Sequence, residues 1–169
     1  MTLQQKLLAK QSKKGFTLVE LVVVIAILGI LAAIAIPAVV GIINNAQKSA
    51  KETNASELSN AVKNLYAGVS AGQINQSTPQ DELNKLNSSA LPAANATVAD
   101  CKKAANKLTV QDAANYGGLA SKFDSSNISD YVYDTTDGTI YYSGSHSGST
   151  TQALTLGTSL GTIRNVSTT

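Results

Sequence analysis

A single carboxylate, that of Glu20, lies near the start of a strongly apolar segment. The sixteen residues that follow it, 21–36, carry no charge, and Glu20 is the one charged residue between Phe16 and Ile43. A helix over residues 16–43 would be roughly 42 Å long, which is enough to cross the hydrocarbon core of a bilayer, about 30 Å thick. The segment therefore predicts a helix that lies in lipid or in a bundle of helices.

A plain membrane anchor would explain the length of this segment but not the charge of Glu20. Even on lenient insertion scales a charge in a lipid-facing helix costs roughly 2.5 to 3.5 kcal/mol, and acids in such helices are by default functional and have a partner. No residue of the segment carries the opposite charge. We therefore expect Glu20 to find no partner inside its own segment and a functional partner outside it.

Residues 1–15 resemble a targeting leader in composition. They contain no acid and four lysines, Lys6, Lys10, Lys13 and Lys14. The positive-inside rule places such a cluster in the cytoplasm and the chain beyond the apolar segment outside. Removal of these residues would leave nine basic side chains (13 − 4) and eleven acidic ones, so the formal net charge would change from +2 to −2. The remainder of the chain therefore has no basic excess for binding nucleic acid.

Glycine and proline interrupt the apolar segment at Gly29 and Pro37. Both residues are tolerated in membrane helices, where neighbouring helices satisfy the freed backbone groups, and we expect Pro37 to kink or loosen the helix. A cleaved secretory signal is an alternative, because Ala33 and Ala35 form a small-residue pattern like that of a cleavage site. The apolar sequence continues past these alanines, however, and this continuation favours a structural segment.

Beyond Ile43 the apolar residues follow the period of an amphipathic helix. They recur at spacings of three and four, at Ala55, Leu58, Val62, Leu65 and Val69. This spacing places them on one face, which predicts a buried stripe. No proline follows Pro37 until Pro79, so one nearly continuous helix can run from Phe16 to about Ala71, with Gly72 as its stop signal.

The remaining sequence predicts short helices and then a sheet. Thr78 and Pro79 form a helix start signal, so we expect helices over 79–87 and 98–107. Candidate strands at 131–133 and 139–142 flank an Asp-Gly pair typical of a hairpin turn, and two more lie at 153–156 and 162–166. The expected fold is α+β, with a long N-terminal helix packed on an antiparallel sheet of three or four strands.

No residue pattern in the polar part indicates catalysis. Cys101 is the one cysteine, which excludes an intrachain disulfide, and we expect it to be buried as a small hydrophobe. The one histidine, His146, lies in a Ser/Gly-rich stretch, 143–149, that predicts a flexible loop. We therefore expect no catalytic residue, no enzyme activity and no cofactor.

The acids and tyrosines of the last third also have a simple structural interpretation. Asp134, Asp137 and Gly138 lack the ligand spacing of a calcium loop and are explained by turn chemistry, so we expect no metal site. Four tyrosines lie on the candidate strands, at Tyr131, Tyr133, Tyr141 and Tyr142. They are ordinary strand residues that pack across a sheet, and a carbohydrate-stacking face is the alternative.

The N-terminal residues resemble those of type IV pilin precursors. The resemblance is carried by Lys-Lys-Gly-Phe-Thr-Leu-Val-Glu-Leu at 13–21, by the apolar stretch to Ile36 and by Pro37. It implies that a prepilin peptidase cleaves between Gly15 and Phe16 and that the new Phe16 amine is N-methylated. It also implies that Glu20 of one subunit pairs with the Phe16 ammonium of a neighbour during assembly.

The resemblance implies a division of the chain into three parts. Residues 1–15 are the cleaved leader, 16–43 the transmembrane and filament-core helix, and 44–169 the globular head. Within the head, 44–71 is the amphipathic helix, 72–125 a loop with short helices and 126–169 the antiparallel sheet. In the filament the helix is expected to loosen between Gly29 and Pro37.

The function that the resemblance implies is that of a major pilin, a structural subunit of an extracellular type IV pilus used in adhesion, aggregation or biofilm formation, or twitching motility. Because Cys101 has no partner, a Gram-positive, clostridial-type pilin without a disulfide is expected. The alternatives are a minor pilin or a pseudopilin of a type II secretion or DNA-uptake system. An alternative of another class is a membrane-anchored surface enzyme or binding module.

The expected partners and location follow from the same resemblance. The partners are other copies of the chain in a helical polymer, the prepilin peptidase, the assembly platform protein with its ATPases, and minor pilins; nucleic acid is not among them. Before assembly the precursor is expected to cross the cytoplasmic membrane once, with its N-terminus in the cytoplasm and its head outside. After assembly it belongs to the pilus, or fimbrium.

Overall fold

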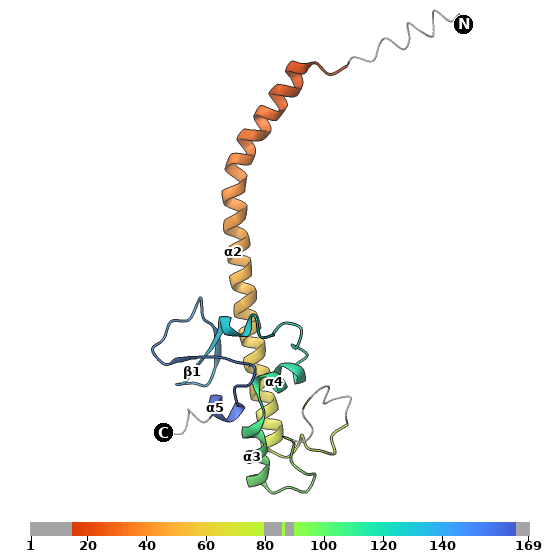
Figure 1. Ribbon diagram of the computed structural model, residues 1–169, viewed down its shortest axis with the longest axis vertical. Helices are drawn as coiled ribbons and strands as arrows, with labels where there is room; N and C mark the ends of the chain where they lie inside the picture. Colours follow the sequence, from red (N-terminus) through yellow and green to blue (C-terminus); the bar gives the residue numbers. More distant parts are fainter. Residues whose placement is uncertain (1–14, 80–85, 87–89, 165–169) are drawn as a thin grey trace, which may run out of the picture. The chain divides into compact units, whose positions relative to one another are not determined.

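The computed structural model describes residues 15–79, 86 and 90–164. The chain divides into two compact units, Met1–Ala46 and Gln47–Thr169, and we call the second unit the head. Helix α2 (Leu18–Ser70) contributes its N-terminal part to the first unit and the remainder to the head (Figure 1). Its bounds confirm the long helix expected from about Phe16 to Ala71.

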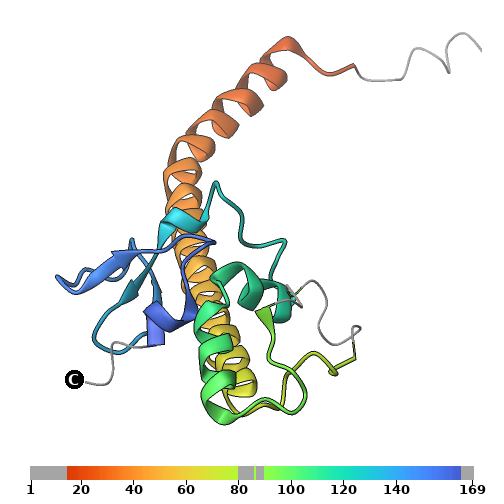
Figure 2. The ribbon, with the colours of Figure 1, turned by 60° about the horizontal axis from the view of Figure 1, so that its bottom comes forward.

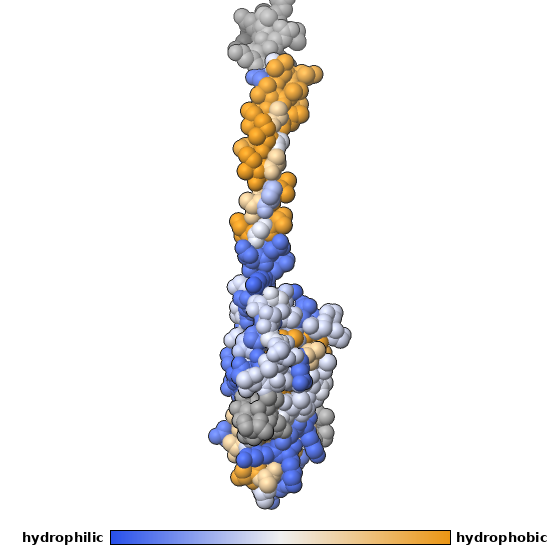
Figure 3. All heavy atoms as spheres, turned by 90° about the vertical axis from the view of Figure 1, so that its left-hand side faces the viewer, coloured by the Kyte–Doolittle hydropathy of each residue, from blue (hydrophilic) through white to orange (hydrophobic). Residues whose placement is uncertain are grey.

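In the first unit, every described residue, 15–46, is exposed. The large apolar side chains have exposed fractions between 47% for Ile43 and 83% for Phe16. Figure 3 shows this part of α2 as mostly hydrophobic, with paler residues along the visible face. By length and composition α2 is the one helix among the described residues that could cross a membrane. A helix pairs most backbone groups within itself, as a lipid environment requires, and Pro37 is the one position of this part that has no amide hydrogen to donate.

The C-terminal end of α2 is set by a glycine in a left-handed conformation. Gly72 has a φ of +73°, a value that residues with a side chain rarely adopt. The Gly72 amide donates to the Val69 carbonyl at 3.0 Å, and the Gln73 amide donates to the Gly68 carbonyl at 2.9 Å. These bonds satisfy carbonyls that the end of the helix leaves free. The predicted stop at Gly72 is confirmed.

The head is built around the apolar stripe of α2. The five predicted stripe residues have exposed fractions of 2% or less: Ala55, Leu58, Val62, Leu65 and Val69. Both ribbon views place the sheet on one side of this part of α2 and helix α4 (Val110–Tyr116) on the other (Figure 1, Figure 2). A Cβ on Gly117, just after α4, would lie 2.8 Å from Ala61 Cβ, so the chain packs directly on α2 there.

The sheet has three antiparallel strands in the order β2-β1-β3. The short helix η2 (Ile128–Asp130) leads into β1 (Tyr131–Asp134), and β2 (Ile140–Tyr142) pairs with β1 in the register Tyr133 to Ile140. The turn between them contains Gly138, whose φ of +64° fits the predicted Asp-Gly turn. The arrangement confirms the predicted α+β fold, with three strands.

The last predicted strand, 162–166, is wrong over its described residues, 162–164, because all three lie in helix α5 (Leu160–Arg164). Leu160 and Ile163 are both fully buried, and their spacing of three is helical. The Leu160 amide donates to the Leu108 carbonyl at 2.8 Å, so this segment packs against the helical part of the head. The strand expected at 153–156 overlaps β3 (Thr151–Ala153) at Ala153 alone, so the prediction was wrong for residues 154–156.

The predictions for the short helices have three outcomes. Helix α3 spans Val98–Lys107, as predicted from the sequence. The helix expected over 79–87 lies almost entirely outside the described residues. Helix α4 was not predicted, although the sequence carries its start signal: Thr109 and Asp112 form a capping box, with the Thr109 amide 2.8 Å from Asp112 Oδ2.

The buried stripe can be tested by substituting Leu65, which is fully buried in the head. Leu65→Ala removes most of a buried side chain and leaves a cavity, so we expect the free energy of unfolding of the head to fall by about 2 to 5 kcal/mol. Denaturant unfolding of the full chain in detergent would measure this loss. The control is Val98→Ala, at a side chain that is 65% exposed; it should change stability by less than about 0.5 kcal/mol. Equal losses in the two variants would contradict the assignment of the core.

Candidate functional site

The N-terminal end of α2 is organised around Thr17 and Glu20. The Thr17 amide and hydroxyl both donate to Glu20 Oε2, at 3.0 and 2.8 Å. The Glu20 amide donates back to Thr17 Oγ1 at 3.2 Å, and the Leu21 amide donates to the Thr17 carbonyl. This reciprocal arrangement is a capping box with Thr17 as the N-cap residue. It holds the carboxylate at the start of the helix, where the helix dipole favours a negative charge.

The expectation that Glu20 finds no partner inside its own segment was wrong for hydrogen bonding. Thr17 belongs to that segment and supplies two donors to the carboxylate. The sequence pattern Thr-x-x-Glu before an apolar run carries the signal for this contact. No cation pairs with Glu20 within the part of the chain that the structure describes, so a charged partner outside the segment stays a prediction.

The peptide bond between Gly15 and Phe16 precedes α2 and is exposed. Gly15, Phe16 and Thr17 have no helical structure, and the Phe16 side chain is 83% exposed. A Cβ added at Gly15 would meet no atom within 4 Å. A peptidase needs an accessible, non-helical backbone, and the bond from Gly15 to Phe16 meets both requirements.

Gly29 and Pro37 both lie within α2, and the structure shows the helix continuing through them. A Cβ added at Gly29 would meet no atom within 4 Å, so no neighbouring group of the single chain requires glycine there. Pro37 has no amide hydrogen to donate to the preceding turn. Loosening of the helix between these residues stays a prediction about the assembled state.

A comparison with protein-family models finds the prokaryotic N-terminal methylation motif at residues 10–36. The chain carries the N-terminal segment of a type IV pilin-like protein. The matched residues include the exposed Gly15–Phe16 bond and the capped Glu20, and they run through most of the apolar surface of the first unit. No curated protein and no solved structure matches the chain.

The motif and the long apolar helix together fit a membrane-anchored pilin precursor that assembles into a surface pilus. In general, the motif implies processing by a prepilin peptidase and self-assembly of the pilin subunits. The motif suggests a structural protein, and it ends before the head begins. The head adds a second polar site, which the motif does not cover.

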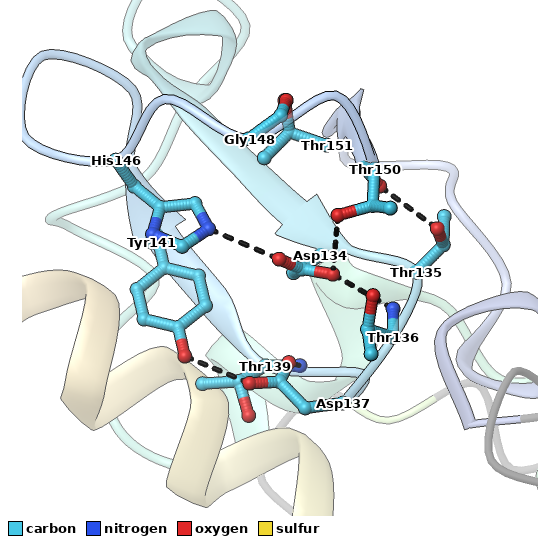
Figure 4. Close-up of polar contacts among 10 residues, drawn as sticks. All are labelled: Asp134, Thr135, Thr136, Asp137, Thr139, Tyr141, His146, Gly148, Thr150 and Thr151. Carbon is cyan, nitrogen blue, oxygen red and sulfur yellow. Dashed lines mark hydrogen bonds and ion pairs between the residues drawn. The ribbon is translucent and has the colours of Figure 1, made fainter.

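In the head, Asp134 accepts hydrogen bonds from three different segments (Figure 4). The Thr136 amide donates to Oδ1 at 2.7 Å and the Thr150 hydroxyl at 3.0 Å, while His146 Nε2 lies 3.1 Å from Oδ2. The Thr136 amide, followed by His146, holds the pKa of Asp134 well below its usual range. Asp134 therefore connects the hairpin turn to the segments that precede β3.

His146 is anchored by a ring contact as well as by Asp134. Its imidazole stacks on the Tyr141 ring at a centroid distance of 3.9 Å and an interplanar angle of 8° (Figure 4). Tyr141 donates its hydroxyl proton to Asp137 Oδ2 at 2.8 Å, and this bond raises the pKa of Tyr141. The loop predicted at 143–149 is present, but His146 ties it to the sheet, a role that the sequence did not reveal.

The carboxylates of this cluster, those of Asp134 and Asp137, accept hydrogen bonds from other groups of the chain. Asp137 Oδ1 accepts the Thr139 amide at 2.7 Å, as expected for turn chemistry. Among the described residues no group of three or more metal-ligating side chains comes together. Cys101 is 3% exposed, and its Sγ lies 4.0 Å from the Ala96 carbonyl oxygen, which confirms the predicted burial.

Two ion pairs that the sequence did not predict connect α2 to the rest of the head. Lys51 Nζ lies 2.9 Å from Asp130 Oδ2 and 5.0 Å from the centroid of the Tyr142 ring. Lys122 Nζ lies 2.6 Å from Glu57 Oε2. Each pair joins residues more than sixty positions apart in the chain, so no local sequence pattern could indicate it.

The lowered pKa of Asp134 predicts a contribution to the pH dependence of stability. A carboxyl whose folded pKa is lowered stabilises the fold above its unfolded pKa, about 4, and this stabilisation is lost as the pH falls below that value. We expect the free energy of unfolding to fall between pH 6 and pH 3, and to fall less steeply in Asp134→Asn. Denaturant unfolding at a series of pH values would measure the slopes, with Glu52→Gln as a control. Identical slopes for the wild type and Asp134→Asn would refute this role.

Proposed function

We propose that the chain is the major structural subunit of an extracellular type IV pilus. The observation that carries the proposal is the apolar first unit: a helix exposed on all sides that directly follows the processing motif. A single chain leaves this surface uncovered, and water disfavours it strongly. Lipid covers it in the precursor, and the helices of other copies cover it in a filament.

Processing at the Gly15–Phe16 bond changes the electrostatics of this helix. Cleavage removes the four lysines of the leader and creates a new ammonium group on Phe16, which is then N-methylated. In an apolar filament core an unpaired carboxylate and an unpaired ammonium group are both costly, and a pair of them is far less so. The Phe16 ammonium of a neighbouring subunit is therefore the charged partner of Glu20. Thr17 holds the Glu20 carboxylate beside the N-terminus until that partner arrives.

The remaining parts of the proposal concern the filament and its assembly. The helix loosens between Gly29 and Pro37 when neighbouring helices pack against it, which lets the filament lengthen under load. The precursor crosses the cytoplasmic membrane once with its head outside, and the assembly platform with its ATPases moves it into the pilus. The pilus serves adhesion, aggregation or twitching motility, and minor pilins belong to the same assembly.

The role of Glu20 can be tested by Glu20→Ala. The substitution removes the charged partner of Phe16 but leaves the cleavage bond intact, so we expect normal processing and little or no assembly. The amount of pilin in the sheared surface fraction and the mass of the membrane-bound chain would report the two steps separately. Glu52→Gln, at an exposed acid of the head on the same helix, is the matched control and should give normal pili. Abundant pili from Glu20→Ala would exclude the proposed pairing.

The composition of purified surface fibres tests the major-pilin role itself. Mass spectrometry should show this chain as the main component, beginning at Phe16 with one added methyl group. Gly15→Val places a branched side chain at the cleavage bond, so the chain should keep its leader and stay out of the fibres. If the wild-type chain occurred only at trace level in the fibres, the minor-pilin alternative would replace the proposal. A mature chain that still begins at Met1 would reject the processing step.

A further inference from the structure

The head contains a cavity of about 240 Å³ between α2 and β2. One wall is formed by residues of α2 and the other by β2 with the loop that follows it. Since a water molecule takes about 30 Å³ in the liquid, the space corresponds to roughly eight waters or to one sugar-sized ring. The cavity lies entirely within the head, so it is present in each copy of the chain.

The polar side chains on the α2 wall make few or no hydrogen bonds or ion pairs with other described residues. Glu52, Ser56, Asn60 and Lys63 follow one another at spacings of four, four and three, which places them on one face of the helix. The first three have no side-chain hydrogen bond or ion pair with any other described residue. Lys63 makes one long bond of 3.5 Å to Thr139 Oγ1, which leaves most of its donor capacity free. This wall therefore offers both donors and acceptors.

The buried part of the lining contains a hydroxyl without a partner. Ala55 and Ile140 are each 2% exposed, and Ser59 beside them is 3% exposed. Ser59 Oγ is buried and has no hydrogen-bond partner among the described residues. Buried polar groups in folded proteins are nearly always paired, and an exception calls for an explanation. The Ser59 Oγ atom is closed off from solvent, so it does not belong to the polar lining that a ligand can reach.

The opposite wall is aromatic and held in place by the cluster around Asp134. Tyr141 lines the cavity, and its ring is fixed by the His146 stack and by the bond to Asp137 (Figure 4). Ser145 also lines the cavity, and its amide and that of His146 both donate to the Tyr142 carbonyl, at 3.1 and 3.2 Å. A wall held in this way loses little conformational entropy when a ligand binds.

We propose that this cavity binds one neutral sugar residue of a surface glycan. The charges of Glu52 and Lys63 cancel, so the lining has no cationic excess for a phosphate or a carboxylate ligand. The hydroxyl and amide groups of the α2 wall suit a ligand whose own hydroxyls both donate and accept. The tyrosines supply apolar contact for the carbon face of the ring. The site belongs to the head alone and does not depend on filament assembly.

The test uses the processed full chain in a detergent without a sugar headgroup. Saturation-transfer NMR and titration are carried out with glucose, galactose, mannose, N-acetylglucosamine and N-acetylgalactosamine, and with glucuronate and inorganic phosphate as anionic probes. We expect at least one neutral sugar to bind at millimolar concentration and neither anion to bind better. Asn60→Leu should lower the affinity for that sugar at least about tenfold, as expected for the loss of hydrogen bonds from a polar site.

Two further variants separate binding from folding. Asn64→Leu, one turn further along α2, does not line this cavity and should leave the affinity unchanged. Ser59→Ala removes a buried hydroxyl that is unpaired and closed off from the cavity, so it should leave sugar binding unchanged without lowering the unfolding midpoint. The proposal is overturned if no sugar of the panel binds, if an anion binds more tightly, or if Asn60→Leu and Asn64→Leu have equal affinity.

Discussion

The structure depends on the fact that one helix serves two different environments. The N-terminal part of α2 has apolar side chains on all sides and no covering from its own chain, whereas in the head only one stripe is apolar and that stripe is buried. Backbone hydrogen bonds inside the helix meet the requirements of both environments. Side-chain pattern alone therefore decides which part stays available to lipid or to other copies and which part organises the head.

The sequence predicted the elements whose signals are local and regular. The stripe from Ala55 to Val69, helix α3 and the Asp-Gly hairpin all follow from spacing or from turn residues close together in the chain. It failed at α5 because Thr162, Ile163 and Val166 have high strand propensity, while burial of Leu160 and Ile163 against the helical part of the head decides the conformation. Tertiary packing, which the sequence does not display, overrode propensity there.

The two polar sites differ in how much of them could be predicted. The position of Glu20 at the start of the apolar segment was clear, but an argument about charge overlooked the two hydrogen bonds from Thr17. The cluster around Asp134 could not be predicted, because Thr150 reaches Asp134 only through the pairing of β3 with β1. His146 occupies a sequence typical of a mobile loop, and a stacked ring and one carboxylate determine its actual position.

The strand order of the sheet has a consequence for crowding. Because β1 is central, both edges of the sheet are formed by strands of only three residues, β2 and β3. A short edge exposes few unpaired backbone groups, so it is a poor template for a strand from another molecule. If copies assemble as proposed, their heads therefore have little means of joining their sheets into one. Contact between copies would then be left to the helix.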